Sequence, residues 1–376
     1  MALSDVRVRT MPESLPTPIV RGMSGAQVAM GVFLIAVIPS ALFGVYNAGH
    51  QANTAMAQLG VAAAPGWRGQ LIELIGTGYD AAGFWAAAVH GAVYFLPVLL
   101  IVMVAAGFWT GLFAAMRRRR VGPGVLGAAL VVVLLLPPTV PLWIAALGMS
   151  FGIIFGREIF GGFGRNVINP AVAALAFLHV AYPAEMMADR VWVPVEGYVG
   201  ATPLEISQHS GLQALTDGGI SWMDAFLGTI PGAFGETSAL AALIGAAILI
   251  GTGLASWRVV AGIVLGAIVT VAMFGFGGGE TEPAANLPWT WHLVLGSFAF
   301  GTVFLAADPV TAASTNTGRW VYGLLIGIMA MVIRIAGPAH ADGVVFAILL
   351  GNIFAPTIDY AVMRANIRRR ARRHVR

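Results

Sequence analysis

Long apolar runs separated by short polar segments dominate this chain. A helix needs about 20 predominantly apolar residues to cross the hydrocarbon core of a bilayer. Ten runs with few or no charged residues approach or exceed that length, some of them only with the help of a neighbouring segment. They lie near 27–48, 84–115, 122–136, 142–156, 166–183, 238–255, 259–276, 290–306, 320–337 and 343–362. The pattern predicts an all-α polytopic membrane protein with about ten transmembrane helices.

Two of these runs are short and flank a proline-rich segment. Runs 122–136 and 142–156 are separated by residues 137–141, which read Pro-Pro-Thr-Val-Pro. Proline removes a backbone donor and disrupts a helix. Non-helical backbone at membrane depth is tolerated only where protein or a cavity covers it. We therefore expect broken or re-entrant helices here.

A weak internal repeat relates the two halves of the chain. Trp143 and Trp291 are each followed four and five residues on by Leu-Gly, then by glycine, phenylalanine and a lone acid, Glu158 in one half and Asp308 in the other. Chance similarity between glycine-rich helices would explain this equally well; a true duplication would give two related bundles. The expected division is 1–22 (N-terminal segment), 23–183 (first bundle), 184–237 (loop), 238–362 (second bundle) and 363–376 (basic tail).

Composition and charge agree with a membrane location and predict an orientation. Charged residues make up 10% of the chain, against about 25% in soluble domains. Among the arginines, only Arg68, Arg190 and Arg334 fall on the side that holds the 184–237 loop. The positive-inside rule then predicts that both termini are cytoplasmic and the loop extracytoplasmic. The basic tail is explained more simply as a topology anchor than as a nucleic-acid site. The absence of cysteine excludes cysteine-ligated iron–sulfur clusters within the chain.

One acid inside a predicted span is a candidate cation ligand. A charge at the bilayer centre costs roughly 2.5–3.5 kcal/mol on insertion scales. Asp308 precedes Pro309 at the inner end of the eighth run. Thr311, Ser314 and Thr315 come shortly afterwards and offer the hard oxygen ligands that small cations prefer. We therefore favour a cation site at Asp308.

Two other charged positions in the spans have simpler explanations. Asp359 lies near the inner end of the tenth run with Arg364 about a turn beyond it. An interfacial acid paired with that arginine is somewhat more plausible than a second cation site. Arg334, near the outer end of the ninth run, is expected to snorkel to the interface.

A glycine-rich segment, 156–170, contains Asn166 and Asn169 at the start of a predicted helix. Glycines let a planar ring approach the backbone, and asparagine side chains with helix-start amides can hold its polar edge. A tight cytoplasmic turn explains the same pattern.

The 184–237 loop contains Gly200, Ala201, Thr202 and Pro203 in succession. The two small residues leave the backbone accessible before the threonine, and the proline stiffens the next part of the loop. By themselves these residues are typical of a surface turn.

Several segments together carry a resemblance to a known family. They are residues 44–49 (Gly-Val-Tyr-Asn-Ala-Gly), 137–143 (Pro-Pro-Thr-Val-Pro-Leu-Trp), 160–170, 230–232, 235–236, 255–258, 291–296 (Trp-His-Leu-Val-Leu-Gly) and 308–310. From about Gln27 to its end, the chain resembles the B subunit of the bacterial sodium-translocating NADH:quinone oxidoreductase. The homologous D subunit of the ferredoxin:NAD oxidoreductase complex is the nearest rival. Segments 46–49 and 291–293 look more like the quinone-reducing branch.

The resemblance implies cofactors and partners. It implies FMN joined through its phosphate to the threonine of a Gly-Ala-Thr motif on the outer side of an inner membrane, here Thr202 with Gly200 and Ala201. It also implies a place in a six-subunit complex with an NADH-oxidising flavin and iron–sulfur subunit. A second flavin, riboflavin, is expected near the two residues Asn166 and Asn169. Ubiquinone is expected near Gly107, Phe108 and Trp109, and sodium at Asp308 and, less strongly, Asp359.

Two departures from the family pattern bear on these expectations. The flavin-attachment motif usually begins with Asp and has Ser or Thr three residues before the threonine, whereas this chain has Glu196 and Val199. Thr202 is intact, so attachment is still expected. In the second span an acid of the family is replaced by Thr110, which bears on sodium coupling rather than on electron transfer.

A function of another class, a flavin-free channel or transporter for a small polar solute, would give a colourless protein.

Overall fold

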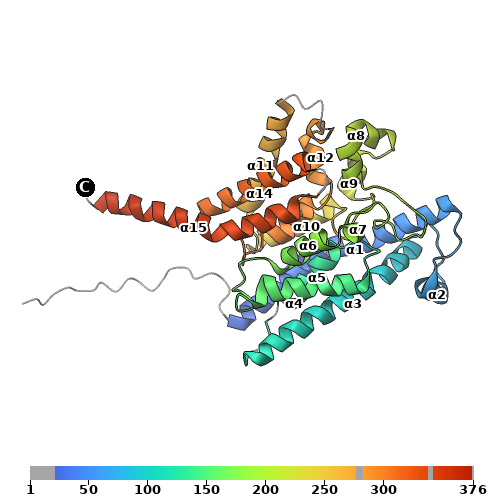
Figure 1. Cartoon of the computed structure of the whole chain (residues 1–376), viewed down its shortest axis with the longest axis horizontal. Helices are drawn as coiled ribbons and strands as arrows, with labels where there is room; N and C mark the ends of the chain where they lie inside the picture. The colour runs from blue at the N-terminus through green and yellow to red at the C-terminus, as the bar shows by residue number, and fades with distance from the viewer. Residues whose placement is uncertain (1–21, 120, 123, 277–282, 338–341, 375–376) are drawn as a thin grey trace, which may run out of the picture.

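The computed structural model describes residues 22–119, 121–122, 124–276, 283–337 and 342–374. Within these ranges every regular element is helical (Figure 1), which confirms the predicted fold class. Nearly all of the expected N-terminal segment, residues 1–21, lies outside the described residues. Arg120 and the last two residues of the basic tail also lie outside them.

All ten predicted spans contain helix, but their lengths differ. Five helices among the described residues are long and apolar enough to cross a membrane, namely α1 (Gly22–Leu59), α3 (Phe84–Met116), α11 (Trp257–Phe276), α14 (Asn316–Ala336) and α15 (Val344–His374). The other five spans contain shorter pieces, namely α4 (Val125–Leu134), α5 (Leu142–Ile153), α6 (Pro170–Ala181), α10 (Ala239–Gly251) and the pair α12 (Trp289–Val294) and α13 (Phe298–Phe300). The chain is a multi-pass membrane protein with several broken helices.

The proline-rich segment 137–141 forms the predicted break between α4 and α5. Its backbone is covered by protein, because Pro137, Pro138 and Val140 are buried. The Thr139 hydroxyl donates a hydrogen bond of 2.9 Å to the carbonyl of Val191. The non-helical backbone is thus shielded in the way that membrane depth requires.

The two halves of the internal repeat have similar local structure. Helix α5 continues into a π-helical turn, η1 (Ile154–Glu158), and α13 continues into another, η3 (Gly301–Ala306). Each turn lies at the lone acid of its half: Glu158 ends η1, and Asp308 lies two residues beyond the end of η3. π-Helical turns are rare and frequently lie at functional sites. The shared geometry favours duplication over chance similarity.

Glycines bring the long helices into backbone contact. A Cβ atom added at Gly91 of α3 would lie 1.8 Å from the carbonyl oxygen of Val45 in α1. A Cβ atom at Gly327 of α14 would lie 2.1 Å from the carbonyl oxygen of Ile263 in α11. Small residues allow such close packing of membrane helices, so α1 packs closely against α3, and α11 against α14.

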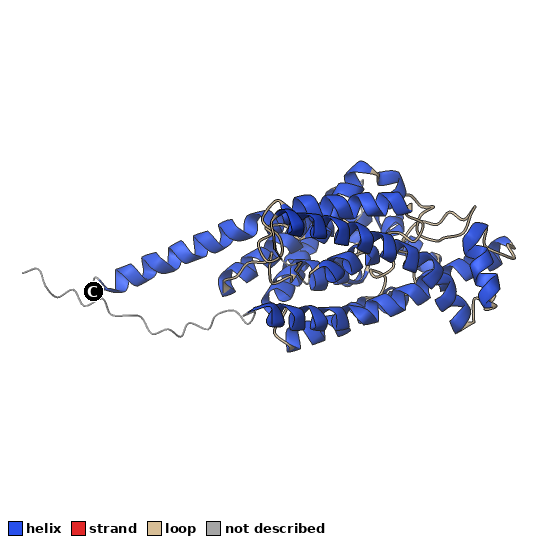
Figure 2. Ribbon diagram, turned by 90° about the horizontal axis from the view of Figure 1, so that it is seen from below, coloured by secondary structure: helices blue, strands red, loops and turns tan. Residues whose placement is uncertain are grey.

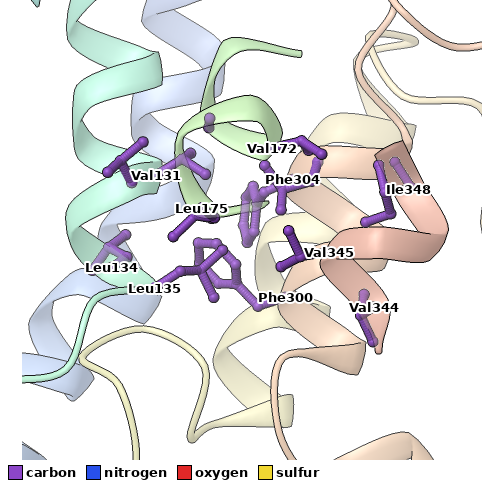
Figure 3. Packing of buried hydrophobic residues seen from close by; sticks show 14 of the residues in the cluster. Val131, Leu134, Leu135, Val172, Leu175, Phe300, Phe304, Val344, Val345 and Ile348 are labelled. Carbon is purple, nitrogen blue, oxygen red and sulfur yellow. The ribbon is translucent and has the colours of Figure 1, made fainter. Parts of the chain in front are cut away.

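The two bundles share one apolar core. Figure 3 shows Val131 and Leu134 of α4 on one side of it and Val345 and Ile348 of α15 on the other. Leu175 of α6 lies between them (Figure 3). Helix α1 also packs against both α3 and α10, which belong to different halves. The half-chains therefore form one packed unit.

The two ends of the helix assembly are built from different elements. Short helices and loops gather at one end in Figure 2, and α15 projects beyond the other end. Helix α15 runs without interruption through the predicted boundary at residue 363, so the described part of the basic tail is helical. The end with the short helices includes α8 (Pro203–Asp217) and α9 (Trp222–Leu227), which belong to the 184–237 loop (Figure 1).

Candidate functional site

Thr202 is the N-cap residue of α8 and is almost completely buried, with 8% of its surface exposed. Its Oγ1 accepts a hydrogen bond of 3.3 Å from the backbone N–H of Glu205 and donates one of 3.0 Å to the Glu205 Oε2. The backbone N–H of Thr202 donates to the same carboxylate oxygen at 2.8 Å. This reciprocal arrangement is a capping box, and it fixes the threonine hydroxyl in one orientation.

The Thr202 side chain lines a cavity where the 184–237 loop meets both bundles. The cavity encloses about 50 Å³ and is open to the outside, and its walls include Leu135 from the first bundle and Val345 from the second. Its polar lining includes Thr202, Glu205, Trp192, Glu236, Thr237 and Asp342. We call this space the Thr202 cavity.

Two polar atoms in the wall of the Thr202 cavity have no hydrogen-bond partner among the described residues. They are the indole Nε1 of Trp192 and the hydroxyl Oγ1 of Thr237. Buried polar atoms are normally paired. A ligand with polar edges could pair with both.

Two carboxyl groups of the Thr202 cavity, those of Glu205 and Glu236, have raised pKa values. Burial, and after it the neighbouring Asp342 carboxylate, raises the pKa of Glu236 to about 8. Burial also raises the pKa of Glu205, against the hydrogen bonds from Thr202 that lower it. Glu236 accepts a hydrogen bond of 2.9 Å from the backbone N–H of Ala233. At neutral pH this wall therefore carries less negative charge than its residue types suggest.

Arg334 lies close to this region and corrects one sequence-based expectation. Its side chain is fully buried and does not snorkel. Nη2 lies 3.1 Å from the Asp342 Oδ1, and Nη1 donates to the carbonyl of His292 at 2.8 Å. The carbonyl of Arg334 accepts from Gln208 of α8 at 3.1 Å. Because α8 and α12 cover the end of α14, the guanidinium meets protein groups rather than the membrane interface.

The residues that line the Thr202 cavity suit the polar edges of a flavin tethered at Thr202. Ligand pockets are typically about 300–1,000 Å³, largely apolar and equipped with a few polar groups. The lining is largely apolar and carries the two unpaired polar atoms described above and a fixed hydroxyl; the enclosed volume, about 50 Å³, is below that range, so a flavin tethered at Thr202 would extend out of the cavity mouth. Glu196 and Val199, the departures from the family motif, are both exposed and do not line the cavity. Gly200 is held by a hydrogen bond of 3.1 Å from its N–H to the carbonyl of Asp189, and Ala201 links it to Thr202.

The structure brings together two residues that the sequence placed in different sites. Asn169 caps α6, and its Nδ2 donates to the Asp308 Oδ2 at 3.1 Å. The backbone N–H of Asn169 donates to the Asn352 Oδ1 at 2.9 Å, and the Asn352 Nδ2 donates to the Tyr322 hydroxyl at 2.8 Å. This network, the Asn169–Asp308 network, joins the start of α6 in the first bundle to Asp308, α14 and α15 in the second. Sequence reasoning missed Asn352 and Tyr322, although an asparagine in an apolar span is a recognisable sign.

The other candidate residues have distinct environments. Asn166 is buried, and its Nδ2 donates to the carbonyl of Ile168 at 3.2 Å, within the turn. Asp359 accepts hydrogen bonds from the backbone N–H groups of Ser314 and Thr315, and from the Thr315 hydroxyl. These bonds use both oxygens of its carboxylate. Among the described residues, no group of three or more His, Asp or Glu side chains is arranged to hold a metal ion.

The predicted quinone residues lie on the outside of α3. Gly107 and Phe108 are exposed, and Trp109 is partly buried. A Cβ atom at Gly107 would meet nothing within 4 Å. The adjacent Thr110 is buried, and its hydroxyl has no hydrogen-bond partner in the described part of the chain. This face is free within the single chain to contact lipid, quinone or another subunit.

Comparison with known proteins identifies the family of this chain. A sequence model of the NQR2, RnfD, RnfE family matches residues 14–368. The chain is 48% identical over 343 residues to the B subunit of the Na(+)-translocating NADH-quinone reductase of Stutzerimonas stutzeri strain A1501, covering 91% of this chain and 85% of that one. It is 46% identical to the subunit of the same name from Azotobacter vinelandii, covering 91% and 85%. It is 47% identical to that of Chromohalobacter salexigens, covering 90% and 82%. The chain therefore belongs to the NQR2, RnfD, RnfE family.

Proposed function

We propose that this chain is the membrane electron-transfer subunit of a sodium-pumping NADH:quinone oxidoreductase, with FMN joined covalently to Thr202. Its relatives bear the name of the B subunit of that reductase, which favours this branch over the ferredoxin:NAD oxidoreductase complex. The other subunits would include the one that oxidises NADH. The complex would lie in a bacterial inner membrane, with both termini of this chain in the cytoplasm.

The observation that carries the proposal is the position of the Thr202 hydroxyl in the wall of the Thr202 cavity. A flavin bound there supplies the capacity to pass electrons one at a time. The residues of this chain would bind and orient it: Trp192 and Thr237 offer unpaired polar atoms, and apolar walls such as Leu135 exclude water. Glu205 holds the attachment oxygen in place through the capping box.

The sites proposed for riboflavin, ubiquinone and sodium follow from the positions of the other candidate residues. Riboflavin is proposed near Asn166 and Asn169, and ubiquinone along the exposed face of Gly107, Phe108 and Trp109. Sodium is proposed at Asp308, with Asp359 as a second, weaker candidate. Moving one charge against 100 mV costs about 2.3 kcal/mol, which a two-electron reduction of quinone can supply.

Flavin fluorescence on a denaturing gel tests the proposal. The chain is expressed together with a flavin-attaching enzyme, and we expect a fluorescent polypeptide of its size. The variant Thr202→Val is the matched control and should be dark while accumulating normally in the membrane. A wild-type band without fluorescence, from a complex that assembles, would favour the flavin-free channel or transporter instead.

A further inference from the structure

The carboxylate of Glu205 touches the atom that would react when a flavin is attached. The Thr202 Oγ1 donates to Glu205 Oε2 across 3.0 Å, and Glu205 lines the same cavity as the hydroxyl. A threonine hydroxyl is a weak nucleophile until a base takes its proton. Hydrogen-bond distance to that proton is the first requirement for a general base.

The same chain contains a second capping box that shows what the motif does when it is only structural. Ser221 caps α9, and its hydroxyl donates to the Asp224 Oδ2 at 2.5 Å. Asp224 is partly buried, like Glu205, but it does not line the Thr202 cavity. Glu205, in contrast, lines that cavity together with Thr202. The two capping boxes have the same hydrogen-bond pattern, but only the one at Thr202 lies beside the cavity.

We propose that Glu205 is the proton acceptor that activates the Thr202 hydroxyl for flavin attachment. This inference rests on the proposed attachment of FMN at Thr202. The co-reactant is a flavin dinucleotide, presented by the attaching enzyme. The Thr202 Oγ1 forms a bond to the phosphorus next to the riboflavin moiety, and the bond between that phosphorus and the bridging oxygen breaks. The nucleoside monophosphate leaves with the bridging oxygen, and the Oγ1 proton passes to Glu205 and then to solvent. No oxidation or reduction occurs.

The charged and titratable groups around Glu205 determine the pH at which it acts. Burial is the largest effect and raises its pKa; Asp189 raises it further and His209 lowers it. Glu236 and Asp342 face the same cavity. Because only the ionised carboxylate accepts a proton, the attachment rate should rise with pH through this raised pKa and level off above it.

Glu205→Gln separates the catalytic role from the structural one. Glutamine at this position satisfies a capping box as well as glutamate does, so α8 should stay intact, but an amide does not accept the proton. Unmodified chain is purified from cells that lack the attaching enzyme, then incubated with that enzyme, magnesium and flavin adenine dinucleotide. The added mass of FMN is followed over time. General base catalysis typically contributes about 100- to 10,000-fold, so we expect Glu205→Gln to react at least about 100-fold more slowly.

Two further variants keep the test decisive. Asp224→Asn alters the second capping box in the same loop and should react like the wild type. Asp189→Asn changes a residue whose charge raises the pKa of Glu205, so it should shift the pH–rate profile to lower pH without affecting folding. Equal rates for wild type and Glu205→Gln would overturn the role of Glu205, as would an unshifted profile in Asp189→Asn. If the wild type itself gains no flavin, the proposed attachment fails instead.

Discussion

Replacing Asp308 with asparagine tests the proposed sodium site most sharply, because the structure defines what the change removes. Asp308 Oδ2 accepts from Asn169 Nδ2 and from the Thr311 hydroxyl, at 3.1 and 3.2 Å. Oδ1 accepts from the backbone N–H of Val310 at 3.1 Å. An asparagine with its oxygen in the Oδ2 position keeps two of these bonds. Its amide nitrogen would then face the Val310 N–H, and one charge-assisted bond is lost, at a cost of about 1.5–3 kcal/mol.

The larger effect should be on sodium. A unit positive charge about 4 Å from a carboxylate gains up to about 4 kcal/mol at an effective dielectric constant near 20. Since 1.4 kcal/mol is tenfold in an equilibrium constant, we expect Asp308→Asn to raise the half-activating sodium concentration at least about tenfold. The assay is NADH-driven quinone reduction by the assembled complex over a series of sodium concentrations.

Tyr322→Phe is the matched control for Asp308→Asn. The Tyr322 hydroxyl donates to the carbonyl of Ala306 at 3.2 Å and accepts from Asn352, so its loss disturbs the Asn169–Asp308 network without changing its charge. The expected stability loss is similar, about 1–3 kcal/mol, but the sodium dependence should stay close to that of the wild type. Equal sodium shifts in both variants, or turnover independent of sodium in all of them, would refute a cation site at Asp308.

Two further predictions concern the quinone face and the Thr202 cavity. Gly107→Leu should raise the KM for quinone severalfold. The variant should still fold, because the added side chain enters open space. Gly111→Leu, one turn further along α3 and equally open, is its control. Normal quinone kinetics in Gly107→Leu would place the site elsewhere. Glu236 has a folded-state pKa near 8 against an ordinary value of 4.5, so its protonated form stabilises the fold fully below about pH 4.5, and this stability is lost as pH rises towards 8. Glu236→Gln should therefore flatten the fall in thermal unfolding midpoint between pH 5 and 8; parallel slopes for the two proteins would contradict the raised pKa.

The fold could be predicted from sequence wherever a physical rule acts on a continuous segment. Span positions correspond to runs of apolar residues, and the break at 137–141 corresponds to its three prolines. The lengths of the helices are harder to predict from the sequence. Helix α1 extends to Leu59, well past the predicted end at residue 48, because its later polar residues find protein partners, as Asn53 does with His90 at 2.6 Å.

The sequence indicates individual candidate residues, but it does not indicate which of them lie in contact. Asn169 and Asp308 stand out individually, yet 139 positions separate them, and only the packing of the two bundles brings them into contact. The burial of Arg334 was missed for a related reason: Asp342 is only eight residues away, but α8, which covers the arginine, comes from a distant part of the chain. Sequence marks a polar residue in an apolar segment, whereas its partner depends on tertiary structure.

The attachment of FMN to Thr202 is the central claim, and the mass of one peptide tests it most directly. The chain contains no lysine, so trypsin cleaves it only after arginine, and residues 191–258 form a single peptide that contains Thr202. In chain isolated from the assembled complex, we expect this peptide to carry the mass of one FMN and fragmentation to place it on Thr202. An unmodified peptide from an active complex, or a flavin on another residue, would contradict attachment at Thr202.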